Sequence, residues 1–316
     1  MKIAITGAAG FVGSNLVYAL QNDNEILAID KLRSNKRLEN GNLESLGHYK
    51  NLLDFNGEFF VGDICDKATI KKIKDFKPDI IYHQAAISDT TIFDQNLIFN
   101  TNLNSFYDFI KLSIKLNAKL IYASSAAVYG NSPSPQSVGI EDPRNPYGMS
   151  KLLMDKLALK YKNEAHIIGL RYFNVYGKGE FYKEKTSSMI LQFALQLLKG
   201  ENPVLFDRSD QIFRDFVYIK DVINANLIAI NSKSGVYNVG SSKARSFQDI
   251  VDVLQIELNT NMKCKYILNP YKDTYQFYTQ AKLDKNFAYR PKFGLEDGIK
   301  DYLKDIKDYY IREINA

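Results

Sequence analysis

Cysteine and histidine are scarce in this sequence of 316 residues, which holds two cysteines and three histidines. Cys65 and Cys264 lie far apart and lack the spacing of metal ligands, so a disulfide framework is not expected and a reducing compartment is favoured. His48, His83 and His166 form no metal-binding pattern either. We therefore expect no metal site.

Long hydrophobic runs and a strong excess of one charge are also missing. No apolar stretch approaches the roughly 18 residues of a membrane span, and a glycine turn interrupts the apolar N-terminus, which argues against a signal peptide. The 41 Lys+Arg and 36 Asp+Glu give a formal net charge of +5, scattered along the chain. Nucleic-acid binders gather such charge into a basic stripe. We therefore expect a cytoplasmic protein with no membrane or nucleic-acid partner. The small basic excess suits an anionic small substrate, and equally suits surface solubility.

Short apolar runs alternate with helical patterns through the first half of the chain. Strands are predicted at residues 2–6, 25–30, 58–61, 79–83, 118–124 and 166–172, and helices at 11–21, 67–76, 102–116 and 146–161. Near-continuous apolar strands are typical of a parallel sheet that is covered on both faces. The alternation predicts an α/β fold with a doubly wound parallel sheet of the Rossmann kind.

A glycine-rich turn joins the first predicted strand to the first predicted helix. Gly7, Gly10 and Gly13 are spaced as Gly-x-x-Gly-x-x-Gly, not as the Gly-x-Gly-x-x-Gly of common dehydrogenases. Glycines let backbone N–H groups approach a pyrophosphate at the positive end of a helix. Any tight turn can use glycine, but here strand, turn and helix are in register. We therefore predict a dinucleotide site that includes Phe11 and Val12.

The pattern changes after residue 174. Helices are predicted at 186–199, 247–257 and 295–310, with strands at 204–206 and 236–240. We predict a dinucleotide-binding Rossmann domain over residues 1–174, with a returning segment near 210–245. Residues 175–316 are expected to form mainly a smaller, discontinuous substrate-binding lobe over the carboxyl edge of the sheet.

The residues after the second strand carry conflicting indications about the dinucleotide. Asp30 ends that strand, and its carboxylate can accept hydrogen bonds from ribose hydroxyls, which favours NAD. Lys31, Arg33, Lys36 and Arg37 follow, and such a basic cluster can hold a 2′-phosphate, which favours NADP. A solvated basic loop is equally compatible. At the end of the fourth strand, small residues would let the cofactor lie against the backbone, and the candidates there are Gln84, Ala85 and Ala86.

A serine, a tyrosine and a lysine form the candidate catalytic set. Ser125 follows the fifth strand, and Tyr147 and Lys151 are four residues apart, so they share one face of the predicted helix. Free tyrosine titrates near ~10, and a nearby ammonium is expected to lower that pKa. Ser125 can hydrogen-bond the reacting oxygen. Such a set suits removal of a hydroxyl proton while hydride leaves the same carbon. With 21 tyrosines in the chain, the Tyr-x-x-x-Lys spacing is informative only beside the glycine turn.

Together these motifs resemble the extended short-chain dehydrogenase/reductase superfamily. The segment Gly62-Asp63-Ile64 is similar to its adenine-contacting segment, although Asp63 equally fits a helix N-cap. In the dehydratase branch an acidic pair usually follows the strand-end Ser/Thr, and here those positions are Ala126 and Ala127. That difference argues against dehydration.

Later segments resemble the branch of epimerases that act on ADP-heptose at C6. Residues 170–177 (LRYFNVYG) are similar to nucleotide-sugar epimerases generally, and residues 178–189 to this branch, whose equivalent segment supplies a second acid/base, here Lys183. Further matches are residues 206–209, 214–218 and 275–280, and the resemblance spans residues 7–301. Departures from the branch fall at Lys178-Gly179, Lys185, Gln192 and Asp207-Arg208.

The resemblance implies further contacts. For the cofactor they come from Ser88, Asn102, Val175 and Lys183, in addition to Lys31, Arg37, Asp63 and Lys151. For the substrate they come from Ser125, Asn174, Lys185, Gln192, Phe206, Asp207, Arg208, Ser209, Arg214 and Tyr275. Arg214 would clamp a diphosphate through two oxygens, or form a surface pair with Asp215. The resemblance also implies tightly held NADP, with NAD as the alternative, and a homopentamer.

The function implied is inversion at C6 of ADP-D-glycero-heptose by transient oxidation and hydride return, for lipopolysaccharide core assembly. Tyr147 and Lys183 would act from opposite sides of that carbon. A UDP-hexose C4-epimerase, which would manage with Tyr147 alone, is the alternative. A catalytically silent NADP-binding regulator is disfavoured, because Tyr147 and Lys151 are both present.

Overall fold

The computed structural model describes residues 1–269 and 277–315 of the chain. Its described residues contain a central parallel sheet of seven strands in the order β10-β6-β5-β4-β1-β2-β3. The strands are β1 (Lys2–Thr6), β2 (Glu25–Asp30), β3 (Glu58–Val61), β4 (Ile80–His83), β5 (Lys119–Ser125), β6 (Ile167–Tyr172) and β10 (Gly235–Val239). This confirms the predicted α/β fold, and it places the carboxyl ends of β1, β4 and β5 side by side.

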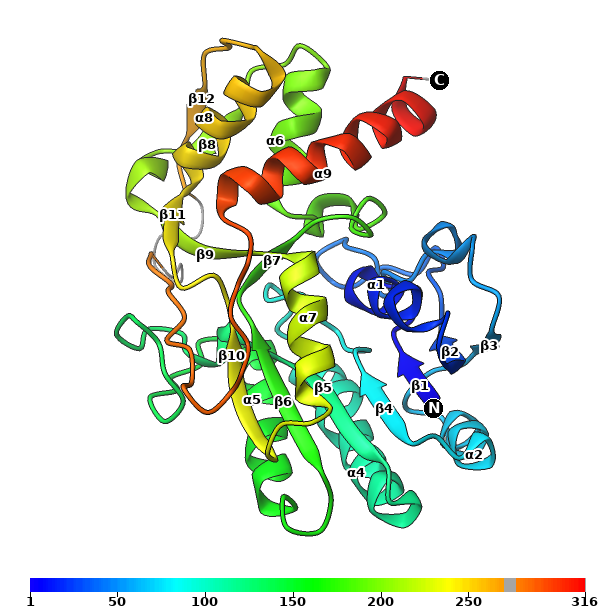
Figure 1. Ribbon diagram of the computed structural model, residues 1–316. Coiled ribbons are helices and arrows are strands. Elements are labelled where there is room, and N and C mark those ends of the chain that lie inside the picture. The colour runs from blue at the N-terminus through cyan, green and yellow to red at the C-terminus, as the bar shows by residue number, and fades with distance from the viewer. Residues whose placement is uncertain (270–276, 316) are drawn as a thin grey trace.

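Helices cover both faces of the sheet (Figure 1). On one face lie α1 (Phe11–Leu20) and α7 (Ile219–Ala229), and on the other lie α2 (Lys67–Phe76), α4 (Ser105–Leu116) and α5 (Pro146–Lys160). Alternate strand residues divide between two apolar cores: Ile3 and Ile5 pack toward α1, whereas Ala4 packs toward α2 and α4. Burial on both faces explains why these strands are continuous apolar runs in the sequence.

A smaller lobe lies beyond the carboxyl edge of the sheet (Figure 1). It contains α6 (Met189–Leu198), α8 (Phe247–Leu258) and α9 (Leu295–Tyr309). It also contains a sheet of β7 (Asn174–Tyr176), β9 (Phe213–Tyr218) and β11 (Ala244–Ser246), and a parallel pair of β8 (Val204–Phe206) and β12 (Lys265–Ile267). The chain leaves this lobe after β9 and returns to the central sheet through α7 and β10. The domain boundary at residue 174 stays a prediction.

Short helical segments complete the described chain. They are η1 (Tyr49–Leu52), α3 (Gln95–Ile98), η2 (Phe99–Asn104), η3 (Ala126–Val128), η4 (Glu184–Thr186), η5 (Ser209–Gln211) and η6 (Tyr310–Ile314). Two predicted helices begin later than expected: the one at 102–116 follows the π-helical turn η2, and the one at 186–199 begins after Ser188, whose hydroxyl caps α6. Within the described parts of the chain, no helix combines the length and apolar character needed to cross a membrane.

Candidate active site

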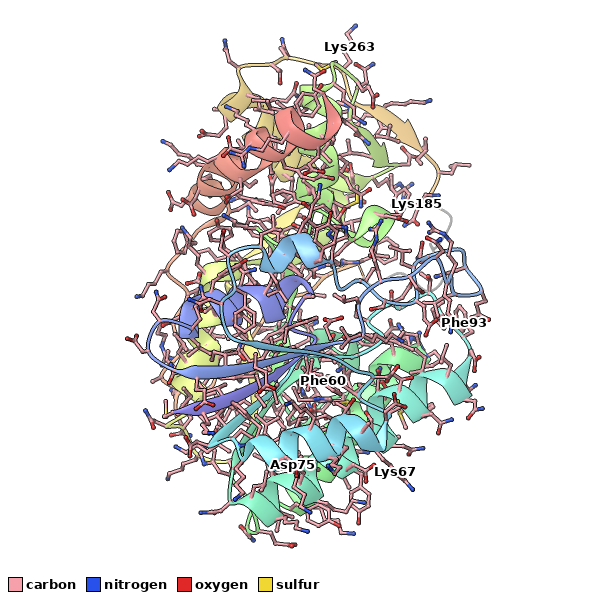
Figure 2. The ribbon with its side chains drawn as sticks, turned by 90° about the vertical axis from the view of Figure 1, so that its right-hand side faces the viewer. Phe60, Lys67, Asp75, Phe93, Lys185 and Lys263 are labelled. Atoms are coloured by element: carbon pink, nitrogen blue, oxygen red, sulfur yellow. The ribbon has the colours of Figure 1, made fainter. Side chains whose placement is uncertain are left out.

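A cleft of about 1300 Å³ lies between the central sheet and the smaller lobe. Ligand pockets usually measure roughly 300–1,000 Å³, so this cleft has room for more than one small molecule. Figure 2 shows Lys185, one of its lining residues, at the level where the two lobes meet. Among the described residues, no group of three His, Cys, Asp or Glu side chains is arranged to hold a metal ion.

The glycine turn forms one wall of the cleft, with Phe11 and Val12 beside it. Gly7 has φ +67°, and a Cβ there would lie 2.8 Å from the backbone nitrogen of Ala85. A Cβ on Gly13 would collide with the carbonyl of Gly7. The first-turn N–H groups of α1 have no partners within the helix, as at any helix start. The N–H groups of Ala8, Ala9 and Gly10 already donate within the protein. The donors for an anion are therefore those of the first turn of α1, which fits a pyrophosphate.

Asp30 and Lys31 line the cleft, but both already have partners. The Asp30 carboxylate accepts the N–H groups of Ala9 (3.0 Å) and Leu32 (2.7 Å), and burial raises its pKa. Each oxygen keeps a second lone pair for a ribose hydroxyl. The Lys31 ammonium lies 2.9 Å from Glu44 and 3.4 Å from Asp63.

Arg37 lines the same region of the cleft and pairs with Glu184 at 3.0 Å. Both side chains are largely exposed, at 48% and 40%. The pair is therefore weak, and it links the segment after β2 to the segment that carries Lys183.

Ser125, Tyr147 and Lys151 come together at the carboxyl end of β5. All three line the cleft, and the Lys151 ammonium nitrogen lies 5.9 Å from the centre of the Tyr147 ring. The same nitrogen donates to the carbonyl of Ala123 at 2.8 Å. Tyr147 is 8% exposed and Lys151 is 1% exposed, so neither group meets bulk water freely.

The Tyr147 pKa was expected to be lowered by the nearby ammonium, and in the protein without cofactor or substrate this prediction is wrong. Burial raises the pKa of Tyr147, and the nearby Ser125 hydroxyl offsets this only in part. Burial also lowers the pKa of Lys151 to about 8, against an opposing effect of Asp155. Desolvation dominates both shifts because both side chains are enclosed.

A buried polar network lies beneath these residues. Asp155, two turns beyond Tyr147 on α5, accepts hydrogen bonds from Tyr122 (2.8 Å), Ser124 (3.0 Å) and the Arg171 Nε (2.8 Å). Arg171 also donates to Glu141 at 2.5 Å. Since Asp155 and Arg171 are 1% and 2% exposed, they fix α5 against the ends of β5 and β6.

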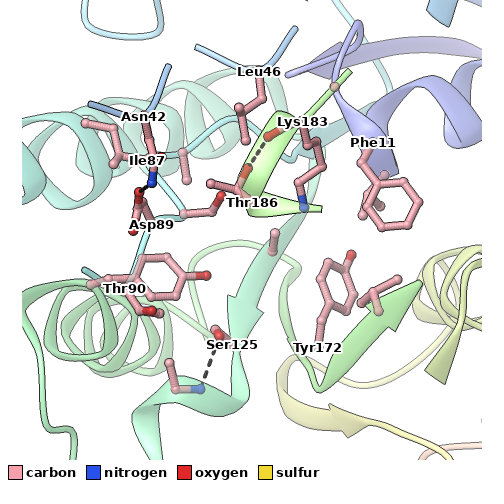
Figure 3. A pocket seen from close by; sticks show the side chains of 18 of the residues that line it. Phe11, Asn42, Leu46, Ile87, Asp89, Thr90, Ser125, Tyr172, Lys183 and Thr186 are labelled. Atoms are coloured by element: carbon pink, nitrogen blue, oxygen red, sulfur yellow. Dashed lines mark hydrogen bonds between the residues drawn. The ribbon is translucent and has the colours of Figure 1, made fainter. Parts of the chain in front are cut away.

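Lys183 enters the cleft from the segment between β7 and α6. Its ammonium nitrogen lies 5.4 Å from the centre of the Phe11 ring. Figure 3 shows it pointing into the space that Ser125 and Tyr172 also face. Burial lowers its pKa, and the carboxylate of Glu180 acts in the opposite direction. Lys183 is therefore more easily deprotonated than an ordinary surface lysine.

Most residues expected to bind cofactor or substrate line this one cleft. Besides those already described, they are Gly10, Gln84, Ala85, Ala86, Ser88, Asn174, Val175, Lys185, Gln192 and Arg214. Asn102 lies behind it instead: its amide donates to the carbonyl of Ile87 (3.0 Å) and to Ser150 (3.1 Å), and its oxygen accepts the Ile87 N–H (2.9 Å). Asn102 therefore orders a wall of the cleft.

Four of the expected substrate residues are not among the cleft-lining residues that the structure describes. They are Phe206, Asp207, Arg208 and Ser209, at the end of β8 and the start of η5. Tyr275 lies outside the described residues. Thr279, a short distance further along the chain, does line the cleft.

Several residues that line the cleft were not predicted from the sequence. Tyr172 lies within the quoted 170–177 segment, and its hydroxyl donates to Gln84 at 3.1 Å. Arg144 lines the cleft just before Asn145, the N-cap of α5, so its proximity to Tyr147 was a usable signal. The segment 40–47 also lines the cleft, held partly by the hydrogen bond from Asn42 to Asp89 (2.7 Å) seen in Figure 3.

The sheet, the glycine turn and the enclosed Ser–Tyr–Lys set define a dinucleotide-dependent enzyme of the short-chain dehydrogenase/reductase type. The model of the NAD dependent epimerase/dehydratase family matches residues 3–240, so the chain belongs to this family. The chain is an epimerase.

Three solved structures illustrate the relationship. ADP-L-glycero-D-manno-heptose-6-epimerase from Helicobacter pylori is 45% identical, over 97% of this chain and 96% of that chain, with a TM-score of 0.90. UDP-glucuronic acid 4-epimerase from Bacillus cereus, solved with UDP-glucuronic acid and NAD, is 26% identical over 98% and 100%, with a TM-score of 0.83. UDP-N-acetylglucosamine 4-epimerase from Methanobrevibacter ruminantium M1 is 24% identical over 99% of each chain, with a TM-score of 0.86, a likeness that shows the fold alone.

Proposed function

We propose that this epimerase inverts C6 of ADP-D-glycero-heptose through transient oxidation at that carbon, supplying heptose for the lipopolysaccharide core. The observation that carries the proposal is that Lys183 and Tyr147 line one cleft beside the glycine turn. The identity of 45% to the H. pylori heptose epimerase supports the substrate.

The residues present fit a nicotinamide dinucleotide. Gly7 and Gly13 leave the turn bare, and Asp30 retains acceptor capacity for a ribose hydroxyl. When bound, the oxidised nicotinamide supplies a reversible hydride acceptor and a positive charge. We propose that Phe11, Val12 and Ala85 would hold the dinucleotide, because all three line the cleft next to the turn.

Two protein groups would then handle protons on opposite sides of the reacting carbon. Tyr147, oriented by Ser125, would take or give the hydroxyl proton of one epimer, and Lys183 that of the other. The lowered pKa of Lys183 helps it to act as a base. Each group is expected to contribute ~10²–10⁴-fold. Arg214, which is 7% exposed, would hold the diphosphate.

The decisive experiment follows ADP-heptose by NMR after incubation with the enzyme in D₂O. We expect inversion at C6 without deuterium uptake at that carbon, because the same hydride returns. Deuterium at C6, or inversion at another carbon, would contradict the proposal. UDP-hexose serves as the second substrate: epimerisation at C4 that persists in Lys183→Met would instead favour the UDP-hexose 4-epimerase.

We propose NADP as the cofactor, with NAD as the alternative. The 2′-phosphate would meet Arg37, which lines the cleft but is paired with Glu184. Titration calorimetry with both dinucleotides tests this. Arg37→Ala should weaken NADP binding and leave NAD binding unchanged, whereas equal effects on both would favour NAD.

The homopentamer remains a prediction carried by the resemblance, and the cytoplasmic location remains a prediction drawn from the composition of the chain. Sedimentation of the purified protein tests the first, and a mass other than a multiple of five chains would contradict it. Fractionation of cells that produce the native chain tests the second.

A further inference from the structure

The place of Lys183 depends on contacts from outside its own segment. It lies between β7 and α6, next to the 3-10 turn Glu184–Thr186. Within the segment, its N–H donates to the carbonyl of Glu180 at 3.1 Å, and its carbonyl accepts the Thr186 hydroxyl at 2.7 Å. These bonds shape the turn but do not relate it to the glycine turn on the other side of the cleft.

Asn51 connects the two turns directly. This side chain belongs to η1 and is 8% exposed. Its amide nitrogen donates to the carbonyl of Ala9 at 3.0 Å and to the carbonyl of Gly179 at 3.1 Å. Ala9 lies in the glycine turn, and Gly179 lies four residues before Lys183. One buried amide therefore holds both backbones at a fixed separation.

His48 makes a second connection between the same two turns. Its backbone N–H donates to the Ala9 carbonyl at 3.0 Å. Its ring stacks on that of Tyr182, with centroids 3.9 Å apart and planes 12° apart. Tyr182 directly precedes Lys183, so the stacked ring limits how far the lysine backbone can move.

The C-terminal helix closes the other side of this stack. The Tyr309 ring meets the edge of Tyr182 at 5.9 Å and stacks on Phe181 at 4.5 Å. Tyr182 is thus held between rings from residues 48 and 309. In addition, Lys50 pairs with Glu313 at 2.5 Å, which joins η1 to the end of the chain.

We propose that His48 and Asn51 are positioning residues that set Lys183 at a fixed distance from the glycine turn, and so align the second proton-transfer group with the cofactor. The inference rests on the proposed function, in which Lys183 acts on the substrate. A displacement of about 1 Å can lower a rate by roughly 10²-fold. Two connections that share the Ala9 carbonyl are well suited to prevent such a displacement.

The first test needs neither cofactor nor substrate. Acetic anhydride labelling at several pH values, with each lysine quantified by mass spectrometry, reports how readily Lys183 loses its proton. In Asn51→Leu and His48→Ala, labelling of Lys183 should begin at a higher pH than in the wild type. The less tightly held ammonium is better hydrated, so its pKa rises toward the ordinary lysine value. His48→Phe, which keeps a stacking ring, should retain the wild-type profile.

Asn24→Ala is the matched control. The Asn24 amide donates to the carbonyl of Leu20 at 2.9 Å, at the far end of α1, and so loses one backbone-directed bond without touching Lys183. Its Lys183 profile should match the wild type, and Lys151 should label alike in all variants. An unchanged Lys183 profile in both Asn51→Leu and His48→Ala would overturn the positioning role.

The second test uses the active enzyme. Asn51→Leu and His48→Ala should lower kcat by about 10- to 100-fold with little change in cofactor dissociation constant. Neither should lower it further in a Lys183→Met background, because effects transmitted through one group are not additive. A full further loss in that background would overturn the inference. A fully active Lys183→Met would instead overturn the proposed function, whatever the labelling shows.

Discussion

Tyr147 and Lys183 line the same cleft, yet the molecule holds them by different means. Tyr147 lies on α5, which Asp155 and Arg171 join to the strand ends through charges that are at most 2% exposed. Lys183 lies on a connecting segment that aromatic stacks and one buried amide hold in place. The first arrangement is rigid and costly to break, whereas the second is a sum of small contacts. The comparison indicates that Lys183 is the group more easily adjusted by substitution.

The largest expected effects come from removing either group. Tyr147→Phe and Lys183→Met should each lower kcat by ~10²–10⁴-fold. If the two groups serve opposite epimers, each variant should still oxidise one of them in a single turnover, and not the same one. The absorbance of the reduced nicotinamide, measured from each purified epimer, reports this. Loss of the same epimer in both variants would contradict the division of roles.

The next largest effect is expected at the buried Asp155–Arg171 pair, which holds the helix that carries Tyr147. Asp155→Asn leaves the Arg171 guanidinium buried with a weakened counter-charge, and breaking such a pair usually costs about 3–5 kcal/mol. Urea denaturation measures the loss in free energy of unfolding. Glu184→Gln, which breaks the exposed pair with Arg37, is the control and should cost under about 1 kcal/mol. Equal losses of unfolding free energy in the two variants would contradict the view that Tyr147 is held more rigidly than Lys183.

A smaller effect is expected at the aromatic stack. Tyr309→Leu keeps an apolar side chain but removes the rings' interaction with Phe181, worth about 0.5–1.5 kcal/mol. It should also lower kcat more than Tyr107→Leu, which removes the surface pair with Tyr161. Thermal unfolding and steady-state rates check both statements. If Tyr107→Leu lowered kcat as much, the stack would have no special connection to Lys183.

The smallest effect concerns stability and pH. Burial lowers the pKa of Lys183 in the folded chain, so its charge costs stability below that pKa, and the cost fades as pH rises toward the ordinary lysine range. Lys183→Met should therefore be more stable than wild type at neutral pH, with a gain that shrinks at higher pH. Unfolding in urea across pH values measures it, and a gain that grew with pH would contradict the sign.

The pKa of Tyr147 is shifted in the opposite direction, and the same unfolding measurement can be applied to it. Burial raises its pKa, so the neutral phenol is stable in the fold up to the ordinary tyrosine range near ~10. The contribution of the neutral phenol to the free energy of unfolding is lost only as pH rises beyond that range. Tyr147→Phe should therefore show no pH-dependent difference from wild type at neutral pH.

The sequence predicted the central sheet well because burial on both faces leaves an unmistakable pattern. The predicted limits of β1, β2, β3 and α2 agree with the structure. The helix α7 was not predicted, because no glycine or proline separates it from β9 and its apolar residues continue those of the strand. Short strands such as β7 and β11 form only through pairing with β9, which local sequence does not specify.

The candidate site was predictable where it follows from topology. Gly7 and Gln84 directly follow β1 and β4, and Ser125 ends the neighbouring strand β5, so they had to converge at one edge of the sheet. Asn42 reaches the cleft only through Asp89, a contact between distant loops that leaves no local signature. The sequence shows that Lys31 and Arg37 are charged, but it does not show that carboxylates from other segments pair with them.

The return of the chain to the sheet has a consequence for how this protein is made. β10, at Gly235–Val239, pairs along one edge of β6, all six residues of which are buried. Until those residues leave the ribosome, β6 presents an open edge that invites pairing with another chain. A fragment that ends at residue 174 would keep that edge permanently. The nucleotide-binding half should therefore aggregate when produced alone, even though most of its sheet is encoded first.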